Sequence, residues 1–272
     1  MVSSKTNTHP LVVDLDGTLI RTDMLVESAS QFLIQHPFQF FKPLLWLMRG
    51  KTVLKTKLAQ CVHLDATALP YNADLLDWLR AEKHAGRRLV LATASHRVLA
   101  DQVAQHLNLF DEVLATEGDT NLKSTAKAQA LIDRFGEGGF DYVGNDWPDM
   151  QVWAKAHTGH VVNAPASLLS RAQAQGNVGQ VFNSNMPSKL VAMLKAMRLH
   201  QWMKNLLVFV PLMAAHQYAD AQRDVLALMA FVIFSLTASS VYLLNDLVDV
   251  QDDRHHARKR HRPFASGALS QI

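Results

Sequence analysis

The chain has 272 residues, enough for one large domain or two smaller ones, and its net charge of +3 and mean hydropathy of −0.01 are those of an ordinary soluble protein. Its single cysteine, Cys61, excludes a disulfide framework within the chain. The N-terminal sequence MVSSKTNTHP lacks the basic and long apolar regions of a secretory signal peptide, so we expect the first half of the chain to stay in the cytosol.

Short apolar segments alternate with helical patterns in the first half. Strands are predicted for LVVDLD (11–16), RRLVLATAS (87–95) and GFDYVGND (139–146), and more weakly for DEVLAT and HVVNA. The helical segments between them include STAKAQALIDRFG, which ends at Gly136 as a helix C-cap would. This alternation predicts an α/β fold with a parallel sheet. Acidic residues end the strands, and open α/β sheets bind ligands at the carboxyl ends of their strands.

A longer helical insertion, about 23–84, separates the first two predicted strands. It contains the unusually apolar segment FQFFKPLLWLMRG. We expect a small helical cap with this segment in its core. The alternative is a surface that rests on lipid, as amphipathic interfacial segments do.

The composition then changes in a way that predicts a domain boundary. Residues 169–188 are rich in Ala, Gln, Asn, Ser and Gly, and we predict a linker there. The linker would join a domain formed by residues 1–168 to a membrane region formed by residues 189–272.

Two apolar segments of the second region are predicted to span a membrane. Val225–Leu244 is uncharged and has about the length that a helix needs to cross a hydrocarbon core of roughly 30 Å. Leu206–Ala215 is shorter and is interrupted by Pro211, but the flanking Trp202 and Tyr218 make it a plausible span because they can act as interface anchors.

Basic residues on both flanks predict how this helical hairpin is oriented. By the positive-inside rule, both flanks face the cytosol of a multi-pass protein in the inner or plasma membrane. The residues are Lys189, Lys195, Arg198 and Lys204 on one flank, and Arg254, Arg258, Lys259, Arg260 and Arg262 on the other.

The first half resembles the haloacid dehalogenase (HAD) superfamily of phosphatases. DLDGTL is similar to the family's first motif, VLATAS to the second, NLKSTAKAQAL to the third and DYVGNDWPDM to the fourth, in the family's order and over about residues 11–163. The resemblance implies a Rossmann-like parallel sheet with a helical cap, and phosphate-ester hydrolysis through an aspartyl-phosphate.

The resemblance also assigns roles to residues. Asp14 would attack phosphorus, and Asp16 would protonate the leaving oxygen and then activate water. Thr93 would donate a hydrogen bond to the phosphoryl oxygens, and a lysine would neutralise their charge. Lys127 fits the family's spacing better, and Lys123 is the alternative.

A Mg²⁺ cofactor is implied by the same motifs. Asp14, the Asp16 carbonyl oxygen and an acid of the fourth motif would hold it, since Mg²⁺ prefers oxygen ligands. The family usually has Asp where Asn145 stands, so Asp146 or Asp149 would have to supply the charge.

The sequence NDLVDVQDD follows the longer apolar segment. Residues three and four positions apart share a face of a helix, so its polar side chains should converge at the cytosolic end of the membrane helix. Such a cluster predicts Mg²⁺ bridging to a pyrophosphate, with nearby cations gripping phosphate oxygens. The alternative is a solvated helix end. The predicted ligands are Asn245, Asp246, Asp249 and Asp253, and the predicted cations are Arg258, Lys259 and Arg262.

This second region resembles the UbiA-type intramembrane prenyltransferases over about residues 186–272. NDLVDVQDD is similar to the family's first aspartate-rich motif, and HQWMKNLLVF with RPFASG is nearest to a branch that transfers phosphoribose to decaprenyl phosphate. The resemblance implies that Lys204 and Asn205 face a polar cavity. Family members have many more membrane helices and a second aspartate-rich motif, so we expect a fragment of a longer protein or a truncated one.

Together these features predict a membrane-bound bifunctional enzyme, a phosphatase joined to part of a prenyltransferase. Its expected partners are a phosphorylated small molecule or lipid-linked sugar phosphate and the membrane lipid polyprenyl phosphate, with no nucleic acid. Two alternatives remain open: a HAD domain that regulates or binds without turnover, and a phosphomonoesterase that the hairpin only anchors.

Overall fold

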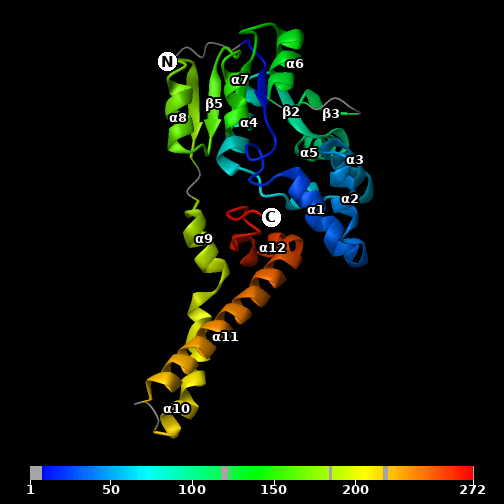
Figure 1. Cartoon of the computed structure of the whole chain (residues 1–272). Helices are drawn as coiled ribbons and strands as arrows, with labels where there is room; N and C mark the ends of the chain where they lie inside the picture. Colours follow the sequence, from blue (N-terminus) through cyan, green and yellow to red (C-terminus); the bar gives the residue numbers. More distant parts are fainter. Residues whose placement is uncertain (1–7, 118–121, 123, 184–185, 217–219, 272) are drawn as a thin grey trace. The chain divides into compact units, whose positions relative to one another are not determined.

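The computed structural model describes residues 8–117, 122, 124–183, 186–216 and 220–271 (Figure 1). Contacts divide the chain into two compact units, Met1–Asn185 together with Ile272, and Met186–Gln271.

The first unit is built on a parallel six-stranded sheet in the order β3-β2-β1-β4-β5-β6. The predicted α/β class is confirmed, and all five predicted strands are present. The strands are β1 (Leu11–Val13), β2 (Leu89–His96), β3 (Glu112–Thr116), β4 (Asp141–Gly144), β5 (Gly159–Val162) and β6 (Val178–Phe182).

Strand β6 corrects the predicted linker. Residues 169–188 contain the end of helix α8 (Ala166–Gln173) and all of β6, and the boundary between the units falls after Asn185. Because β6 is an edge strand and none of its residues is fully buried, it has no need of the apolar run that marks a central strand.

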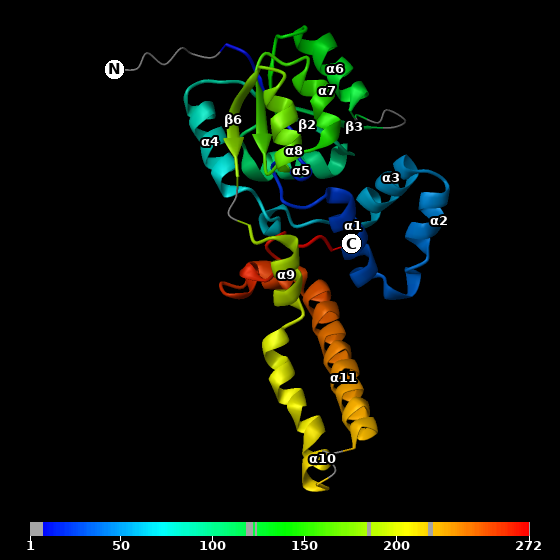
Figure 2. The same ribbon diagram turned by 60° about the vertical axis from the view of Figure 1, so that its left-hand side comes forward.

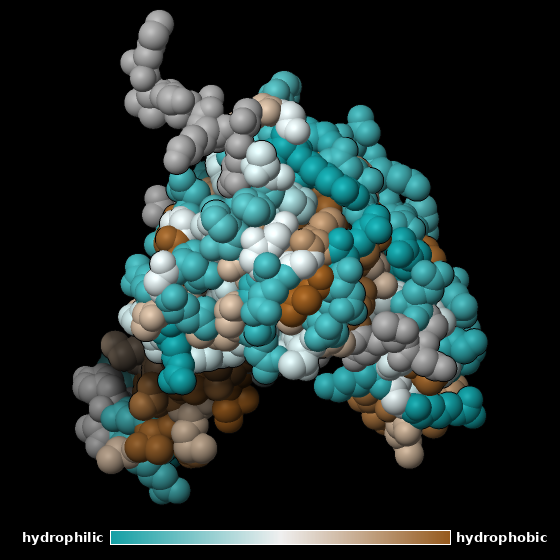
Figure 3. All heavy atoms as spheres, turned by 90° about the horizontal axis from the view of Figure 1, so that it is seen from above, coloured by the Kyte–Doolittle hydropathy of each residue, from teal (hydrophilic) through white to brown (hydrophobic). Residues whose placement is uncertain are grey.

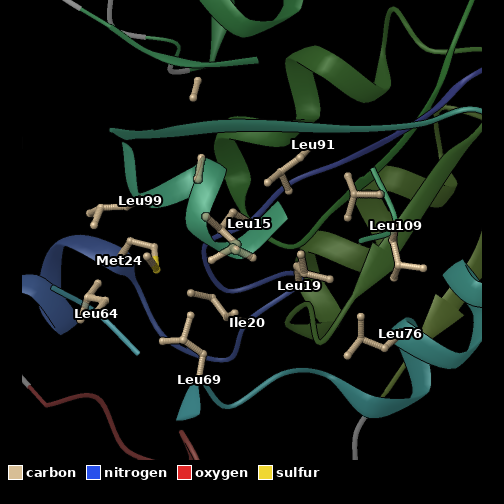
Figure 4. Close-up of a cluster of buried hydrophobic side chains, with 14 of the residues drawn as sticks. Leu15, Leu19, Ile20, Met24, Leu64, Leu69, Leu76, Leu91, Leu99 and Leu109 are labelled. Carbon is tan, nitrogen blue, oxygen red and sulfur yellow. The ribbon is translucent and has the colours of Figure 1, made fainter. Parts of the chain in front are cut away.

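Helices cover both faces of the sheet. Leu11 and Val13 of β1 point into one hydrophobic cluster and Val12 into the other, as the two-residue period of a strand requires. The first cluster also holds the leucines that follow β1 (Figure 4). The helices are α4 (Ala73–His84), α5 (Arg97–Leu107), α6 (Thr125–Phe135), α7 (Met150–Trp153) and α8, with short 3-10 turns η2 (Ala66–Ala68) and η3 (Trp147–Asp149).

The predicted helical cap is present but shorter than expected. Helices α1 (Met24–Gln35), α2 (Lys42–Met48) and α3 (Lys51–Cys61), with the 3-10 turn η1 (Pro37–Gln39), form a group beside the sheet domain (Figures 1 and 2). Helix α4, which the prediction placed in the cap, belongs to the sheet domain, because Trp78 packs against His160 of β5 and Phe182 of β6.

The apolar segment 38–50 is not the core of the cap, which corrects the favoured interpretation. Phe32, Leu54 and Leu58, from α1 and α3, are buried, whereas no residue of η1 or α2 is. Trp46 is half-buried against Phe32, with ring centroids 5.2 Å apart.

The second unit contains α9 (Lys189–Ala196), the 3-10 segment η4 (Leu199–Phe209), α10 (Val210–Ala214), α11 (Ala221–Val248), α12 (Val250–His255) and η5 (Lys259–His261). Among the described residues, α11 alone is long and apolar enough to cross a membrane, and it includes the predicted span Val225–Leu244. The shorter predicted span, Leu206–Ala215, is divided between η4 and α10, both of which pack along α11. Its predicted anchor Tyr218 lies outside the described residues.

Candidate functional site

The residues of the four motifs meet at the carboxyl ends of β1, β2 and β4, as predicted. Asp14 directly follows β1, and its N–H donates to the Val143 carbonyl of β4 at 3.0 Å. The chain then turns at Gly17, whose φ is +73°, and a Cβ there would lie 2.3 Å from the Asn145 side-chain nitrogen. Only glycine fits this turn, because both its backbone conformation and the space exclude a side chain.

A buried ion pair joins the first and third motifs. The Lys127 Nζ, in the first turn of α6, donates to Asp14 Oδ1 at 2.7 Å and to the Tyr142 hydroxyl at 3.0 Å. The Tyr142 hydroxyl in turn donates to Asp149 Oδ1 at 2.8 Å. The structure therefore brings Lys127 to Asp14, while Lys123 lies outside the described residues.

Asp16 is held on both of its carboxylate oxygens. Its Oδ1 accepts the Met24 N–H at 2.7 Å, and its Oδ2 accepts the hydroxyls of Thr93 at 3.1 Å and Ser95 at 2.7 Å. Sequence reasoning missed Ser95. The alternation of β2 could have found it, because residues two apart on a strand point to the same side.

The fourth motif forms a tight turn around Asp149. Its Oδ2 accepts the N–H groups of Asn145 at 2.9 Å and Asp146 at 3.1 Å, so both oxygens of this buried carboxylate have donors. Asp146 is exposed and caps the next turn by accepting the Trp147 N–H. Asn145 Oδ1 accepts the Thr18 hydroxyl at 3.1 Å, which places this amide beside the turn after Asp14.

Burial and charge shift the titration of these groups. Burial raises the pKa of Asp14 to about 7; Lys127 opposes the rise, and the Asp149 and Asp16 charges add to it. Burial also raises the pKa of Asp16. Burial alone would lower the pKa of Lys127, but the charges of Asp14 and Asp149 raise it instead.

The oxygen-rich donor set is compatible with Mg²⁺. Burial is the main cause of the raised pKa of Asp14, and the nearby charges of Asp149 and Asp16 add to it, so a divalent cation here would favour the ionised carboxylate. Among the described residues, no group of three His, Cys, Asp or Glu side chains is arranged to hold a metal ion. A cation would therefore also need carbonyl or amide oxygens, such as the Asp16 carbonyl and the Asn145 side chain.

A lysine of the cap also reaches this end of the sheet. Lys55 of α3 donates to the Ala94 carbonyl at 2.6 Å, next to Ser95. A cavity of about 10 Å³ lies there between cap and sheet, lined by Leu25, Ser28, Lys55, Leu58, Ser95, His96 and Leu99. No motif marked Lys55, because it lies in the insertion.

The aspartate-rich segment of the second unit is only partly gathered. Asp246 and Asp253 are buried and share Arg262, whose Nη1 lies 3.1 Å from Asp246 Oδ1 and 2.7 Å from Asp253 Oδ2. Arg198 Nη2 lies 2.7 Å from Asp246 Oδ1, and Lys259 Nζ 3.6 Å from Asp253 Oδ1. Asp246 lies near the end of α11 and Asp253 in α12, which follows directly after Asp249, so the two carboxylates come close enough to share one guanidinium.

The remaining predicted residues of the second unit lie apart from this ion-pair cluster. Asn245 and Asp249 form an exposed row beside it, so the four polar residues do not all converge. Arg258 and Lys204 are also exposed. Asn205 donates to Ser235 of α11 at 2.9 Å, and Trp202 donates to Ser239 at 3.0 Å, so both fasten η4 to α11.

Two family models match parts of the chain. Residues 53–138 match the haloacid dehalogenase-like hydrolases, and residues 205–272 match the UbiA prenyltransferase family. Both resemblances predicted from the motifs are confirmed for these regions.

One curated protein is similar to nearly the whole chain, and others are similar to less than a third of it. The "Uncharacterized protein y4nM" of Sinorhizobium fredii is 34% identical over 261 residues, which is 96% of this chain and 50% of that protein. The decaprenyl-phosphate phosphoribosyltransferase of Mycobacterium tuberculosis is 47% identical over 90 residues, 30% of this chain and 29% of that protein. The nodulation protein NoeC of Azorhizobium caulinodans is 49% identical over 76 residues, which is 28% of this chain and 24% of that protein. The chain thus spans half or less of these relatives.

Solved structures match 65% of this chain at low sequence identity. A predicted phosphatase from Clostridium acetobutylicum matches 65% of this chain and 95% of its own with 16% identity and a TM-score of 0.48. An apo phosphoserine phosphatase matches 65% of this chain and 94% of its own, with 13% identity and a TM-score of 0.45.

Proposed function

We propose that this chain, which joins a haloacid dehalogenase-like hydrolase region to a UbiA prenyltransferase-family region, is a membrane-bound phosphohydrolase that acts on a lipid-linked sugar phosphate. The observation that carries the hydrolase part is the buried pair of Asp14 and Lys127, 2.7 Å apart, with Asp16 two residues further on. A nucleophilic carboxylate, an acid and a cation are the groups that phosphoryl transfer through an aspartyl-phosphate requires.

The first step would transfer the phosphoryl group to the protein. An Asp14 oxygen attacks phosphorus, the phosphorus–oxygen bond to the leaving group breaks, and Asp16 gives its proton to that oxygen. Burial raises the pKa of Asp16, which favours the protonated form that this step needs. Lys127 offsets the charge of the phosphoryl oxygens.

The second step would release phosphate. Asp16, now ionised, takes a proton from a water molecule, whose oxygen attacks the phosphorus of the aspartyl-phosphate and restores Asp14. Mg²⁺, when bound, would supply further positive charge at the phosphoryl group. Asp14, the Asp16 carbonyl and Asn145 or Asp146 are the proposed ligands; Asp149 is less suited, because three hydrogen bonds already occupy its oxygens.

The lipid part of the proposal rests on the second unit. The matched UbiA residues include the aspartate-rich cluster and α11, and the similar mycobacterial protein is named for transfer of phosphoribose to decaprenyl phosphate. We propose that Asp246, Asp249 and Asp253 with Mg²⁺, and the cations Arg258, Lys259 and Arg262, bind the phosphates of such a substrate in the whole protein. The hydrolase would then remove the terminal phosphate of the attached sugar.

The test measures phosphate release by the full chain in detergent, with Mg²⁺, from a lipid-linked phosphoribose and from the soluble ester p-nitrophenyl phosphate. We expect turnover of both, with higher kcat/KM for the lipid, and a loss on the order of 1,000-fold or more in Asp14→Asn. Turnover of only the soluble ester would reject the lipid substrate and leave the hydrolase.

One observation favours a second candidate, a domain that binds phosphate without turnover. Asn145 brings no charge where relatives of this motif usually carry Asp, which weakens a cation site. Under this alternative neither ester is hydrolysed at any Mg²⁺ concentration, and Asp14→Asn has no activity to remove.

A further inference from the structure

The cap carries an apolar surface that its own folding does not use. Among the described residues of the first unit, every exposed large hydrophobic side chain other than Val98 and Trp147 lies between residues 33 and 48. Phe38 is 91% exposed, Met48 79% and Phe40 68%. The inner side of the cap is closed separately by Phe32 and Leu58, so this outer surface does not contribute to a core.

The surface is concentrated rather than scattered, which is the condition under which exposed apolar residues indicate a binding partner. It comprises Leu33, Phe38, Phe40, Phe41, Leu44, Leu45, Leu47 and Met48. By contrast, the surface of the α/β core that Figure 3 shows is mainly hydrophilic.

The charge around this surface has one sign. From Ser28 to Leu64 the sequence contains no Asp or Glu, while it contains Lys42, Arg49, Lys51, Lys55 and Lys57. Arg49, Lys51 and Lys57 are exposed. Aromatic and aliphatic side chains bordered by cations complement the interface of a bilayer that contains anionic lipids.

The same chain holds a helix able to cross a membrane, Ala221–Val248. A tether of this kind keeps the first unit at high local concentration near the bilayer, so that a weak surface contact becomes populated. We propose that η1 and α2 of the cap insert into the anionic membrane interface and form a second contact between this protein and lipid. This contact does not depend on the proposed hydrolase activity.

The test measures how deeply a label on the cap lies in the bilayer. The full chain carrying Cys61→Ser and Phe38→Cys is labelled with an environment-sensitive fluorophore and reconstituted into vesicles of phosphatidylcholine and phosphatidylglycerol, with and without nitroxide-labelled lipid. We expect a blue shift and quenching by the nitroxide lipid, both reduced in vesicles of phosphatidylcholine alone. A label at Gln129→Cys, exposed on α6, serves as the matched control and should show neither.

Two outcomes would overturn the proposal. A label at position 38 that is as water-exposed as the one at position 129 would show that the cap does not touch lipid. A blue shift that increases with the protein-to-lipid ratio, without quenching by the nitroxide lipid, would show that this surface binds a second copy of the protein. In a variant with Arg49→Glu and Lys51→Glu, both exposed, the preference for anionic lipid should be lost while the hydrolase retains its activity.

Discussion

At the residue scale, the candidate active site is defined by which charges lie next to Asp14. Burial raises the pKa of Asp14 to about 7, and Lys127, 2.7 Å away, opposes this rise and favours the ionised, nucleophilic carboxylate. Asp149, although it belongs to the fourth motif, mainly organises the turn that follows β4. The site therefore contains one lysine that acts on charge and one aspartate that acts on backbone geometry.

Replacing Lys127 tests the first of these roles. Lys127→Met removes the cation beside Asp14, which favours the protonated, non-nucleophilic carboxyl and leaves the phosphoryl charge without its partner. We expect kcat/KM for p-nitrophenyl phosphate to fall on the order of 100-fold or more. Lys155→Met is the control, because Lys155 forms an exposed ion pair with Glu137 and should leave kcat/KM unchanged.

A second prediction concerns pH and stability. Burial lowers the pKa of His160 to about 4, so between pH 6.5 and 4 the unfolded chain takes up a proton at this residue that the folded chain does not. Stability is therefore lost as pH falls below about 6.5, by about 2 kcal/mol at pH 5. Thermal unfolding followed by tryptophan fluorescence at pH 7 and pH 5 should show this loss.

The comparison of variants isolates the histidine from other titrating groups. In His160→Gln the difference in melting temperature between pH 7 and pH 5 should shrink, whereas His63→Gln, at an exposed position, should behave like the unaltered chain. An unchanged difference in His160→Gln would mean that this imidazole is not the acid-sensitive group.

At the scale of elements, the sequence predicts the central strands more clearly than the edge strands, since β3 is only a weak candidate and β6 is missed. Buried strand β1 is a continuous apolar run followed directly by Asp14, and that pattern is visible in the sequence. Edge strand β6 is preceded and followed in the sequence by polar residues, so the sequence pattern predicts a linker there. The apolar run of α2 predicted burial, because periodicity cannot distinguish a core from a lipid-facing surface. The alternation of the second strand marks Ser95 in the sequence, whereas Lys55 lies in the insertion and its contact with this strand is visible only in the structure.

The packing of η4 against α11 gives a prediction at this scale. Ser235 and Ser239 of α11 accept hydrogen bonds from Asn205 and Trp202, and Ser239 also donates to the Met197 carbonyl. Because hydrogen bonds between membrane helices contribute about 1 kcal/mol each, losing these three bonds in Ser235→Ala with Ser239→Ala should destabilise the second unit by about 3 kcal/mol. Unfolding in detergent with increasing SDS measures this.

The same helix offers a matched control. Ser240 is exposed, and within the described part of the chain its hydroxyl donates to the Thr237 carbonyl of its own helix. Ser240→Ala should therefore unfold at the same SDS fraction as the unaltered chain. If Ser240→Ala lowered the SDS fraction at unfolding as much as substitution of Ser235 or Ser239, helix propensity rather than the hydrogen bonds to η4 would account for the effect.

At the scale of the whole molecule, the chain combines a region that matches haloacid dehalogenase-like hydrolases with a region that matches the UbiA prenyltransferase family. If the second region is inserted in a membrane, the side on which the hydrolase region lies determines which substrates reach it. Basic residues flank the apolar segments, and from the positive-inside rule we propose that both flanks and the preceding unit lie in the cytosol. Multi-pass insertion and this orientation are proposals that a chemical probe can test.

The single cysteine provides that probe without any engineering. Cys61, exposed at the end of α3, should react with a membrane-impermeant maleimide in inside-out vesicles and not in intact cells. Reaction in intact cells would place the hydrolase unit on the outer side and would contradict the predicted orientation. Detergent-solubilised protein, in which the thiol is accessible from every side, gives the full extent of labelling.

The position of the sheet's strands in the sequence also affects the order in which the protein folds during synthesis. All six strands precede Ala221, where α11 begins, so a ribosome has produced the complete sheet before it starts the candidate membrane helix. Domains generally fold in order of synthesis, so the first unit can reach its native state before α11 is made. Any insertion of α11 into the bilayer would then begin when the N-terminal unit is already folded.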